Sequence, residues 1–187
     1  MTGFSIQQPW NELVVSGVKT IEVRGYRRYP TLPMTLAIHA GLVFDARAPL
    51  PICEEAAKGG AGTHARRGAI TGVATLVEIV RFTPTSWSDL IQQHRNPLEW
   101  YQDGLWAWRF TKAIRLAEPV RCRGALGFWS LPRDVTVRVR RMLAAASAQD
   151  ATRAADRGGP TELGGLEGSE TAGPGAEGPK TGHEDAL

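Results

Sequence analysis

The sequence predicts an α+β domain: a mixed β-barrel, closed or nearly closed, flanked by short helices and followed by a disordered C-terminal tail. Strand-like patterns outnumber helical ones and do not alternate regularly with them, which favours a barrel over a βαβ architecture. Every Phe, Trp and Tyr lies before residue 130. The 187 residues therefore hold one domain and an appendage.

The first elements are short. Residues 3–6 alternate as a strand does, and Pro9 suits the first turn of a helix, where a missing N–H costs nothing. Trp10 begins an apolar face of helical spacing, and Gly17 ends that helix. Residues 20–24 alternate again and predict a second strand.

The rest of the domain follows the same logic. We expect a strongly apolar strand over 35–39 and a helix over 52–58 that two glycines close. The longest strand signal follows over 69–82, and a short capped helix over 85–90. Two further strands, a Gly-Phe-Trp segment and a final helix are expected over 106–116, 119–123, 127–129 and 133–146.

The composition changes at the end of that helix. The last 44 residues contain 9 Gly, 3 Pro and no aromatic residue. Such a segment cannot bury enough apolar surface to offset the entropy of ordering its backbone. We therefore expect a domain over residues 1–146 and a disordered Gly/Pro/acidic tail over residues 147–187.

The charge divides at nearly the same place. From residue 144 onward there are eight acidic and three basic side chains, a net charge of −5, so the +3 of the whole chain corresponds to a body of +8. A basic body suits an anionic partner, nucleic acid first, through its summed field. A soluble basic surface without such a partner is the alternative, and charge alone does not separate the two.

Several function classes find no support in the sequence. Cys53 and Cys122 stand far apart without a partner motif and are expected to be free thiols in a reducing compartment. No apolar run approaches the ~20 residues that span a bilayer, so a cytoplasmic protein without a membrane partner is expected. We find no metal-ligand spacing and no nucleotide-cofactor fingerprint, and expect neither metal nor cofactor.

The strongest candidate site lies between the first helix and the second strand. Glu22 and Arg24 share one strand face with Thr20, while Ile21 and Val23 face the core. Lys19 follows the helix-ending glycine and can turn toward the same polar face. The three side chains could form a pocket with a cation or proton donor, an acceptor and an anion clamp. An edge strand with a solvent-exposed ion pair is the alternative.

Other candidates have ordinary structural explanations. Glu78 is a possible functional carboxylate or the first exposed residue of a departing strand. Trp106 and Trp108 could stack on bases, although spacing of two favours one side of a core. His39 ends an apolar strand, which favours a hydrogen-bonded structural histidine.

Taken together, these stretches resemble the ASCH domain family. The matching segments are, in order, Gln8-Pro9-Trp10, Gly17 through Arg24, Ile38-His39-Ala40, Gly72-Val73-Ala74 and Gly124 through Trp129. Any one motif is weak, whereas five in the expected order over roughly residues 3–132 are specific. The tail has no counterpart in the family pattern.

The resemblance implies a PUA-like barrel with a cleft lined by the Gly-x-Lys-x-x-Glu region. It implies RNA binding, and in some small bacterial relatives an amidohydrolase of N4-acetylcytidine or a ribonuclease. In the amidohydrolases a lysine and a threonine three residues later act with a distant glutamate. Here those positions hold Lys19 and Glu22, and a carboxylate cannot replace the hydroxyl. Gln7 stands where many relatives carry a basic residue.

The leading hypothesis is a nucleic-acid-binding domain that recognises RNA or a single nucleotide in a polar cleft. The expected ligand-binding residues are Gln8, Trp10, Lys19, Glu22, Arg24 and His39. The second hypothesis is a hydrolase of a modified nucleoside or RNA, with Lys19 and Glu22 as catalytic residues. The third is a protein-interaction domain with a vestigial cleft. The sequence leaves open whether the chain is an enzyme and what its oligomeric state is.

Overall fold

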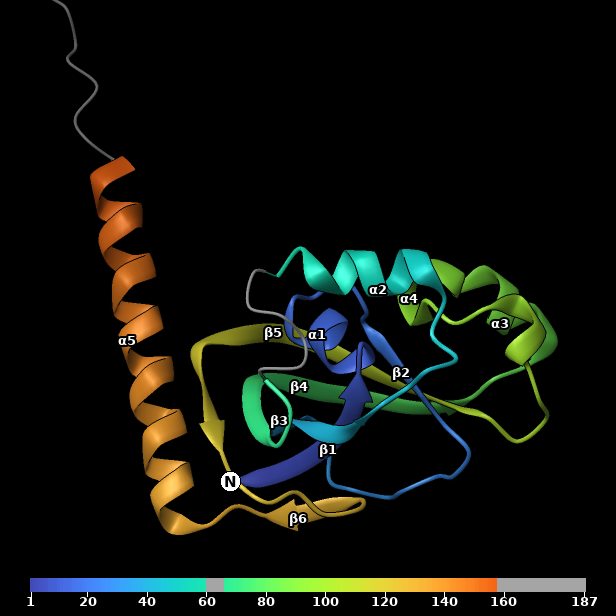
Figure 1. Cartoon of the computed structure of the whole chain (residues 1–187), viewed down its shortest axis with the longest axis horizontal. Helices are drawn as coiled ribbons and strands as arrows, with labels where there is room; N and C mark the ends of the chain where they lie inside the picture. Colours follow the sequence, from blue (N-terminus) through green and yellow to red (C-terminus); the bar gives the residue numbers. More distant parts are fainter. Residues whose placement is uncertain (60–65, 158–187) are drawn as a thin grey trace, which may run out of the picture.

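The computed structural model describes residues 1–59 and 66–157. One curved six-stranded sheet runs through it, in the order β2-β5-β4-β3-β1-β6 (Figure 1). The strands are β1 (Thr2–Gln8), β2 (Ile21–Arg24), β3 (Met34–Phe44), β4 (Ala69–Arg81), β5 (Trp106–Arg121) and β6 (Phe128–Ser130). β1 and β3 are parallel, and all other neighbours are antiparallel.

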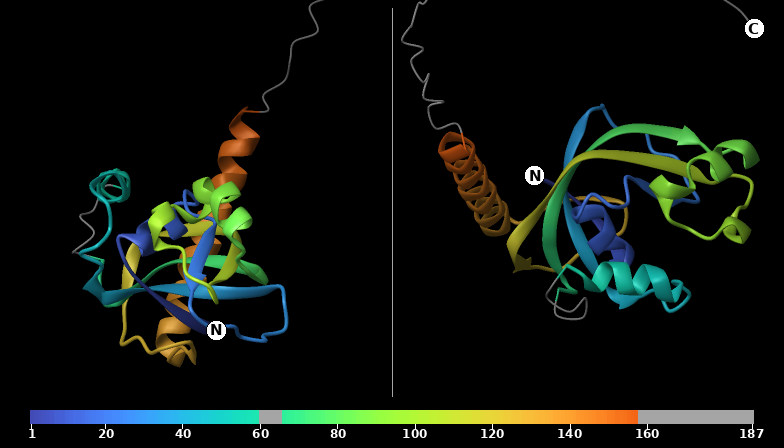
Figure 2. Two further views of the ribbon diagram at one scale, coloured as in Figure 1. Left: turned by 90° about the vertical axis from the view of Figure 1, so that its right-hand side faces the viewer. Right: turned by 90° about the horizontal axis from the view of Figure 1, so that it is seen from above.

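The helices are short except for the last. They are α1 (Trp10–Val15), α2 (Leu50–Ala57), α3 (Pro84–Asp89), α4 (Ile91–His94), the 3₁₀ turn η1 (Leu98–Trp100) and α5 (Arg133–Arg157). α1 contacts β1, β3, β4 and β5 and lies inside the curve of the sheet (Figure 2). α3 and α4 gather at the end of the sheet opposite α5 (Figure 1).

The predicted α+β class is confirmed, but a closed barrel is not. Among the described residues β2 and β6 are the two ends of an open sheet. The sheet curls so strongly that the ring of Phe4 on β1 stacks on Trp108 on β5, with centroids 5.1 Å apart. Next to this contact the Arg24 side chain of β2 donates a hydrogen bond of 2.9 Å to the carbonyl oxygen of Ser5 on β1. A side chain thus bridges the gap that a barrel would close with strand pairing.

Three apolar clusters form the core of the described part of the chain, and two of them account for most of its buried residues. The larger of these two fills the space between the sheet and α1 and contains Phe4, Ile6, Leu13, Trp108 and Phe110. The other lies under the first half of α5, whose Val135 and Val139 are buried. The core assignment of Trp108, favoured by its spacing, is therefore confirmed.

Three expected elements differ in extent. The strands expected over 106–116 and 119–123 are one strand, β5, whose pairing with β4 shifts in register between Arg115 and Val120, so that Pro119 takes no part in the ladder. The last helix runs to Arg157 rather than stopping at the predicted domain end, Ala146. Of the disordered tail expected over 147–187, residues 147–157 belong to α5, and residues 158–187 lie outside the described residues.

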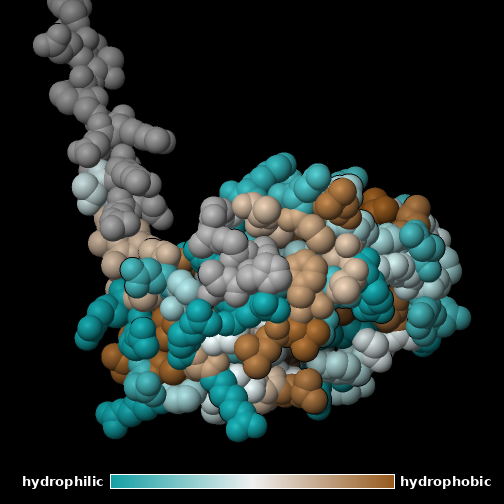
Figure 3. Space-filling view, in the orientation of Figure 1, coloured by the Kyte–Doolittle hydropathy of each residue, from teal (hydrophilic) through white to brown (hydrophobic). Residues whose placement is uncertain are grey.

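The surface in the orientation of Figure 1 is mostly hydrophilic, with apolar patches toward its middle and lower edge (Figure 3). None of the described helices has both the length and the apolar character that crossing a membrane requires. Within the same residues, no group of His, Cys, Asp and Glu side chains is arranged to hold a metal ion. Both cysteines are free thiols.

Candidate functional site

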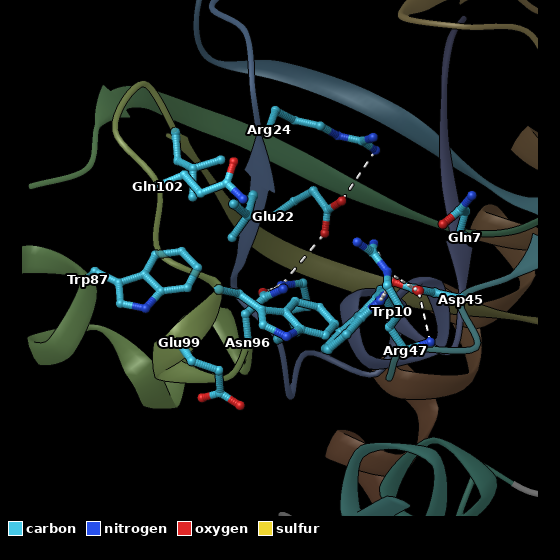
Figure 4. A pocket seen from close by; sticks show the side chains of 14 residues that line it. Gln7, Trp10, Glu22, Arg24, Asp45, Arg47, Trp87, Asn96, Glu99 and Gln102 are labelled. Carbon is cyan, nitrogen blue, oxygen red and sulfur yellow. Dashed lines mark hydrogen bonds and ion pairs between the residues drawn. The ribbon is translucent and has the colours of Figure 1, made fainter. Parts of the chain in front are cut away.

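A polar pocket of about 420 Å³ opens where α1, β2 and the α3–η1 region meet. This volume is within the range of small-molecule sites. The lining side chains come from segments far apart in the sequence and are drawn in Figure 4. They are Gln7, Trp10, Lys19, Glu22, Val23, Arg24, Asp45, Arg47, Trp87, Asn96, Glu99, Trp100, Gln102 and Leu105.

Lys19 lies at the bottom of the pocket. α1 ends at Val15, and Gly17 follows with a φ of +78°, the left-handed conformation that glycine adopts without strain. The Lys19 N–H then donates to the Leu13 carbonyl oxygen, which turns the chain back. Its side chain is 1% exposed, although it carries a charge.

The Lys19 ammonium group is held by three polar partners. It donates to the His94 carbonyl oxygen and to Asn96 Oδ1, the latter at 3.1 Å. Glu22 Oε2 lies 3.7 Å away. The ammonium also sits 5.1 Å from the centre of the Trp10 ring. Burial lowers the pKa of Lys19 to about 8, with the Glu22 charge opposing and the Arg24 charge adding to that shift.

Asn96 is positioned by a histidine behind the pocket. The Trp87 carbonyl oxygen can only accept, so His94 Nε2 donates to it at 2.8 Å. His94 Nδ1 is then the acceptor for the Asn96 N–H at 3.0 Å. The imidazole stacks on the Trp87 ring at 4.0 Å. Burial lowers the pKa of His94, which keeps the ring neutral and able to accept.

Glu22 lies between Lys19 and Arg24, two of the cations that line the pocket. Its Oε1 atom pairs with Arg24 Nη2 at 3.3 Å, and its other oxygen faces Lys19. Arg24 also covers the Phe4 ring at 4.7 Å in addition to its bond to the Ser5 carbonyl oxygen. Arg24 therefore has fixed structural partners, whereas the sequence had suggested a free anion clamp.

A third cation, Arg47, stands at the pocket rim. Trp10 Nε1 donates to Asp45 Oδ2 at 3.0 Å, and Asp45 pairs with Arg47 Nε at 3.0 Å. Burial raises the pKa of Asp45, but hydrogen bonds from Arg47 and Trp10 outweigh it, so the pKa is lower than usual. The Arg47 side chain is 77% exposed and extends over the Trp100 ring at 5.1 Å.

Four of the six expected ligand-binding residues line this pocket: Trp10, Lys19, Glu22 and Arg24. Gln8 does not, because its side chain is fully buried and accepts from the Glu12 N–H, while Gln7 faces the pocket. Strand alternation after Phe4 and Ile6 is the signal that distinguishes the two glutamines. Glu78 is also outside, half-exposed and paired with Arg109.

His39 belongs to a different part of the molecule. It is buried, faces Ser5 Oγ and the Cys122 carbonyl oxygen at 3.2 Å each, and lines a separate apolar pocket. Burial lowers its pKa. The chain passes so close that a side chain at Gly124 would collide with the imidazole, which explains a glycine there. Its hydrogen bonds agree with a structural histidine.

Sequence reasoning missed most of the pocket's far wall. Asp45 and Arg47 follow β3, Asn96 lies between α4 and η1, and Trp100 ends η1. None belongs to a local motif. The sequence identified Trp87 only as an apolar residue of the short helix expected over 85–90.

The ASCH domain family matches residues 4–120. A crystal structure of the ASCH protein from Zymomonas mobilis superposes with a TM-score of 0.51 at 16% identity, covering 77% of this chain and 93% of that one. A variant of that protein gives 0.52 at 15% identity, covering 75% and 96%. This likeness shows the fold alone.

A comparison with curated proteins found no significant match. The family match covers more than half of the chain, including most of β1, the Lys19–Arg24 segment and most of β5. The expected resemblance is confirmed, and this chain belongs to the ASCH domain family.

Proposed function

We propose that this protein binds single-stranded RNA and holds one nucleotide of it in the polar pocket. The observation that carries the proposal is a buried, charged lysine next to a carboxylate and an amide, in a pocket lined by three tryptophans. Buried polar groups need partners, and a nucleobase edge offers both donors and acceptors to Glu22, Asn96 and Gln102. Membership of a family associated with RNA supports the same partner.

The three tryptophans have unequal roles in this proposal. Trp87 is buried and stacks on His94, and Trp10 is 6% exposed. Trp100 is only half-buried and meets Trp10 edge to face at 6.0 Å. Trp100 therefore offers the accessible ring for a base, with the exposed guanidinium of Arg47 beside it for phosphate. The same proposal includes a PUA-like fold for the curved sheet and a cytoplasmic location for the protein.

Titration of the purified chain with nucleoside monophosphates and short single-stranded RNA tests it, with tryptophan fluorescence as readout. Trp100→Ala should weaken binding by about 1–3 kcal/mol, the usual contribution of base stacking. Arg47→Ala should weaken RNA binding and lower the slope of log affinity against log salt by about 0.7. Arg138→Ala is the matched control, because Arg138 is exposed and belongs to α5, which contributes nothing to the pocket lining and lies at the opposite end of the sheet from α3 and α4 (Figure 1).

Arg47→Ala and the control should melt like the parent, whereas Trp100→Ala should lose some stability because its ring packs against two core clusters, so its binding is measured well below its melting range. If RNA and nucleotides fail to bind the parent, or if Trp100→Ala and Arg47→Ala bind like Arg138→Ala, the pocket is not the RNA site. The protein-interaction alternative then becomes the better account.

A hydrolase of a modified nucleoside is the second candidate. The lysine with lowered pKa 3.7 Å from Glu22 is a pair of groups suited to proton transfer. Turnover of acylated nucleosides, N4-acetylcytidine among them, tests this candidate. Glu22→Gln should abolish turnover if the carboxylate carries a proton, while a base-edge acceptor role tolerates the amide. Binding without turnover in the parent excludes the candidate for the substrates tried.

A further inference from the structure

The segment that follows β2 carries two tyrosines and two arginines that the pocket does not use. Tyr26, Arg27, Arg28 and Tyr29 are consecutive and exposed, and we refer to them as the Tyr-Arg arm. Tyr29 is 81% exposed and Tyr26 is 38% exposed. Such exposure is unusual for large aromatic side chains in a soluble domain, so the arm needs an explanation beyond packing.

The side chains of the arm form layers. The Arg27 guanidinium lies 4.3 Å from the centre of the Tyr29 ring and 5.1 Å from that of Trp106, so it contacts both rings. The Arg28 guanidinium lies 5.4 Å from the Tyr26 ring. Tyr26 in turn meets the buried Trp108 edge to face at 5.7 Å. These contacts hold the arm against the sheet in a defined arrangement.

Neither arginine of the arm is neutralised. Among the ion pairs of the described residues, none includes Arg27 or Arg28, whereas Arg24 two residues before the arm pairs with Glu22. The arm therefore presents two uncompensated cations next to exposed aromatic faces. Single-stranded nucleic acid is bound by this combination, because arginines contact phosphates and rings stack on bases irrespective of sequence.

The arm is continuous with the pocket. β2 places Arg24 in the pocket wall, and the chain runs from there directly into Tyr26 (Figure 4 shows the ribbon of β2 continuing past Arg24). At its other side the arm reaches the β6 end of the sheet, where Arg28 Nη2 lies 3.3 Å from the place a side-chain carbon on Gly127 would take. A single-stranded RNA with one nucleotide in the pocket can therefore continue along the arm.

We propose that the Tyr-Arg arm is a second binding subsite, which holds the nucleotides flanking the one in the pocket. This inference rests on the proposed function of the pocket and adds a requirement for chain length. It predicts that affinity rises from a mononucleotide to a short oligonucleotide and that the rise depends on the arm.

The experiment measures affinity of the full chain for a nucleoside monophosphate and for single-stranded RNA of two to eight nucleotides. Arg27→Ala/Arg28→Ala should leave mononucleotide affinity within about twofold of the parent. The same variant should lower the salt slope for the octanucleotide by about 1.4, twice the single-strand value per contact. Tyr29→Ala should weaken octanucleotide binding at least about fivefold, and Tyr29→Phe should restore it because the ring remains.

Arg138→Ala again serves as the matched loss of one exposed arginine and should leave both affinities unchanged. The inference is overturned if the octanucleotide binds no better than the monophosphate, or if the arm variants bind it like the parent. Mononucleotide binding that persists in either case leaves the pocket proposal intact. If the parent binds the octanucleotide but no monophosphate, and the arm variants lose octanucleotide binding, the result supports the arm as an RNA site and refutes the pocket as one.

Discussion

The Nζ atom of Lys19 lies 3.7 Å from Oε2 of Glu22, and both groups are almost completely removed from solvent. A buried ion pair seldom stabilises a fold, because removing two charges from water costs more than their attraction returns. The pair is completed by Asn96, the His94 carbonyl oxygen and Arg24. Such a network at a pocket floor agrees better with the proposed binding of a ligand than with a purely stabilising role.

The first prediction concerns the charge of Lys19. Its pKa in the folded chain is about 8 and its ordinary value is 10.5. Between these values the unfolded chain binds the proton and the folded chain does not, so the free energy of unfolding should rise with pH across this window. The free energy of unfolding should rise by at most about 3 kcal/mol across this window. Below pH 8 the contribution of Lys19 to the stability should not change with pH.

Urea denaturation at pH 7 to 10.5 checks this prediction against Lys19→Met, which cannot titrate. The difference between parent and variant should change by this amount over the window. An NMR titration of the lysine side-chain signals gives the midpoint independently. Parallel curves for the two proteins, or a midpoint near 10.5, would show that Lys19 is hydrated.

The second prediction concerns His94. Burial lowers the pKa of His94 below its ordinary value near 6.5. Just below pH 6.5 the unfolded chain therefore binds more protons at this position than the folded chain does. Stability should fall as the pH falls from about 6.5, and protonation should break the Asn96 N–H bond to Nδ1. His94→Gln should be less stable at neutral pH but should lose this dependence. A parent and variant with equal slopes between pH 6.5 and 5 would contradict it.

The third prediction is that Trp10 is mainly structural. Its ring belongs to the core cluster and its Nε1 donates to Asp45. Trp10→Ala should cost about 3–5 kcal/mol, the range for a large buried aromatic, and Trp10→Phe much less. Denaturant midpoints measure both. If Trp10→Ala keeps the parent's stability and loses only ligand binding, the ring is instead a stacking surface.

The fourth prediction separates the two arginines of the pocket. Arg24→Ala should destabilise the domain by about 1–3 kcal/mol, because its bonds link β2 to the Ser5 carbonyl oxygen and to Glu22. Arg47 is exposed, and Arg47→Ala should leave the melting temperature within error while weakening RNA binding. Thermal melting and salt-dependent titration, done together, distinguish these outcomes. Equal stability of the two variants would mean that the Arg24 bridge contributes nothing.

The fifth prediction concerns the C-terminal segment. The described side chains of α5 that pack on the sheet, Val135, Val139, Met142 and Leu143, all precede Ala146. Truncation after Ala146 or after Arg157 should therefore leave the melting temperature unchanged. Removal of the acidic segment should also raise affinity for polyanions at low salt. A melting temperature lower by several degrees would show that the removed residues dock.

Much of the fold was readable from local patterns. Alternation predicted β1, β2 and β4, and the Pro9–Gly17 spacing predicted α1, because these signals depend only on neighbours along the chain. The order of five motifs predicted the family. Lys19, Glu22 and Arg24 could be grouped for the same reason, since they stand within six residues of one another.

The remainder depended on contacts between distant segments. Asn96 reaches Lys19 only because α4 packs beside β2, and Asp45 reaches Trp10 only because β3 lies parallel to β1. Strand alternation could have predicted that Gln8 is buried and Gln7 is not. It could not have predicted the pocket that Gln7 lines. The free energy that selects these pairings comes from burying the inner face of the sheet against α1 and part of its outer face against α5, which is a property of the assembled core and not of any segment.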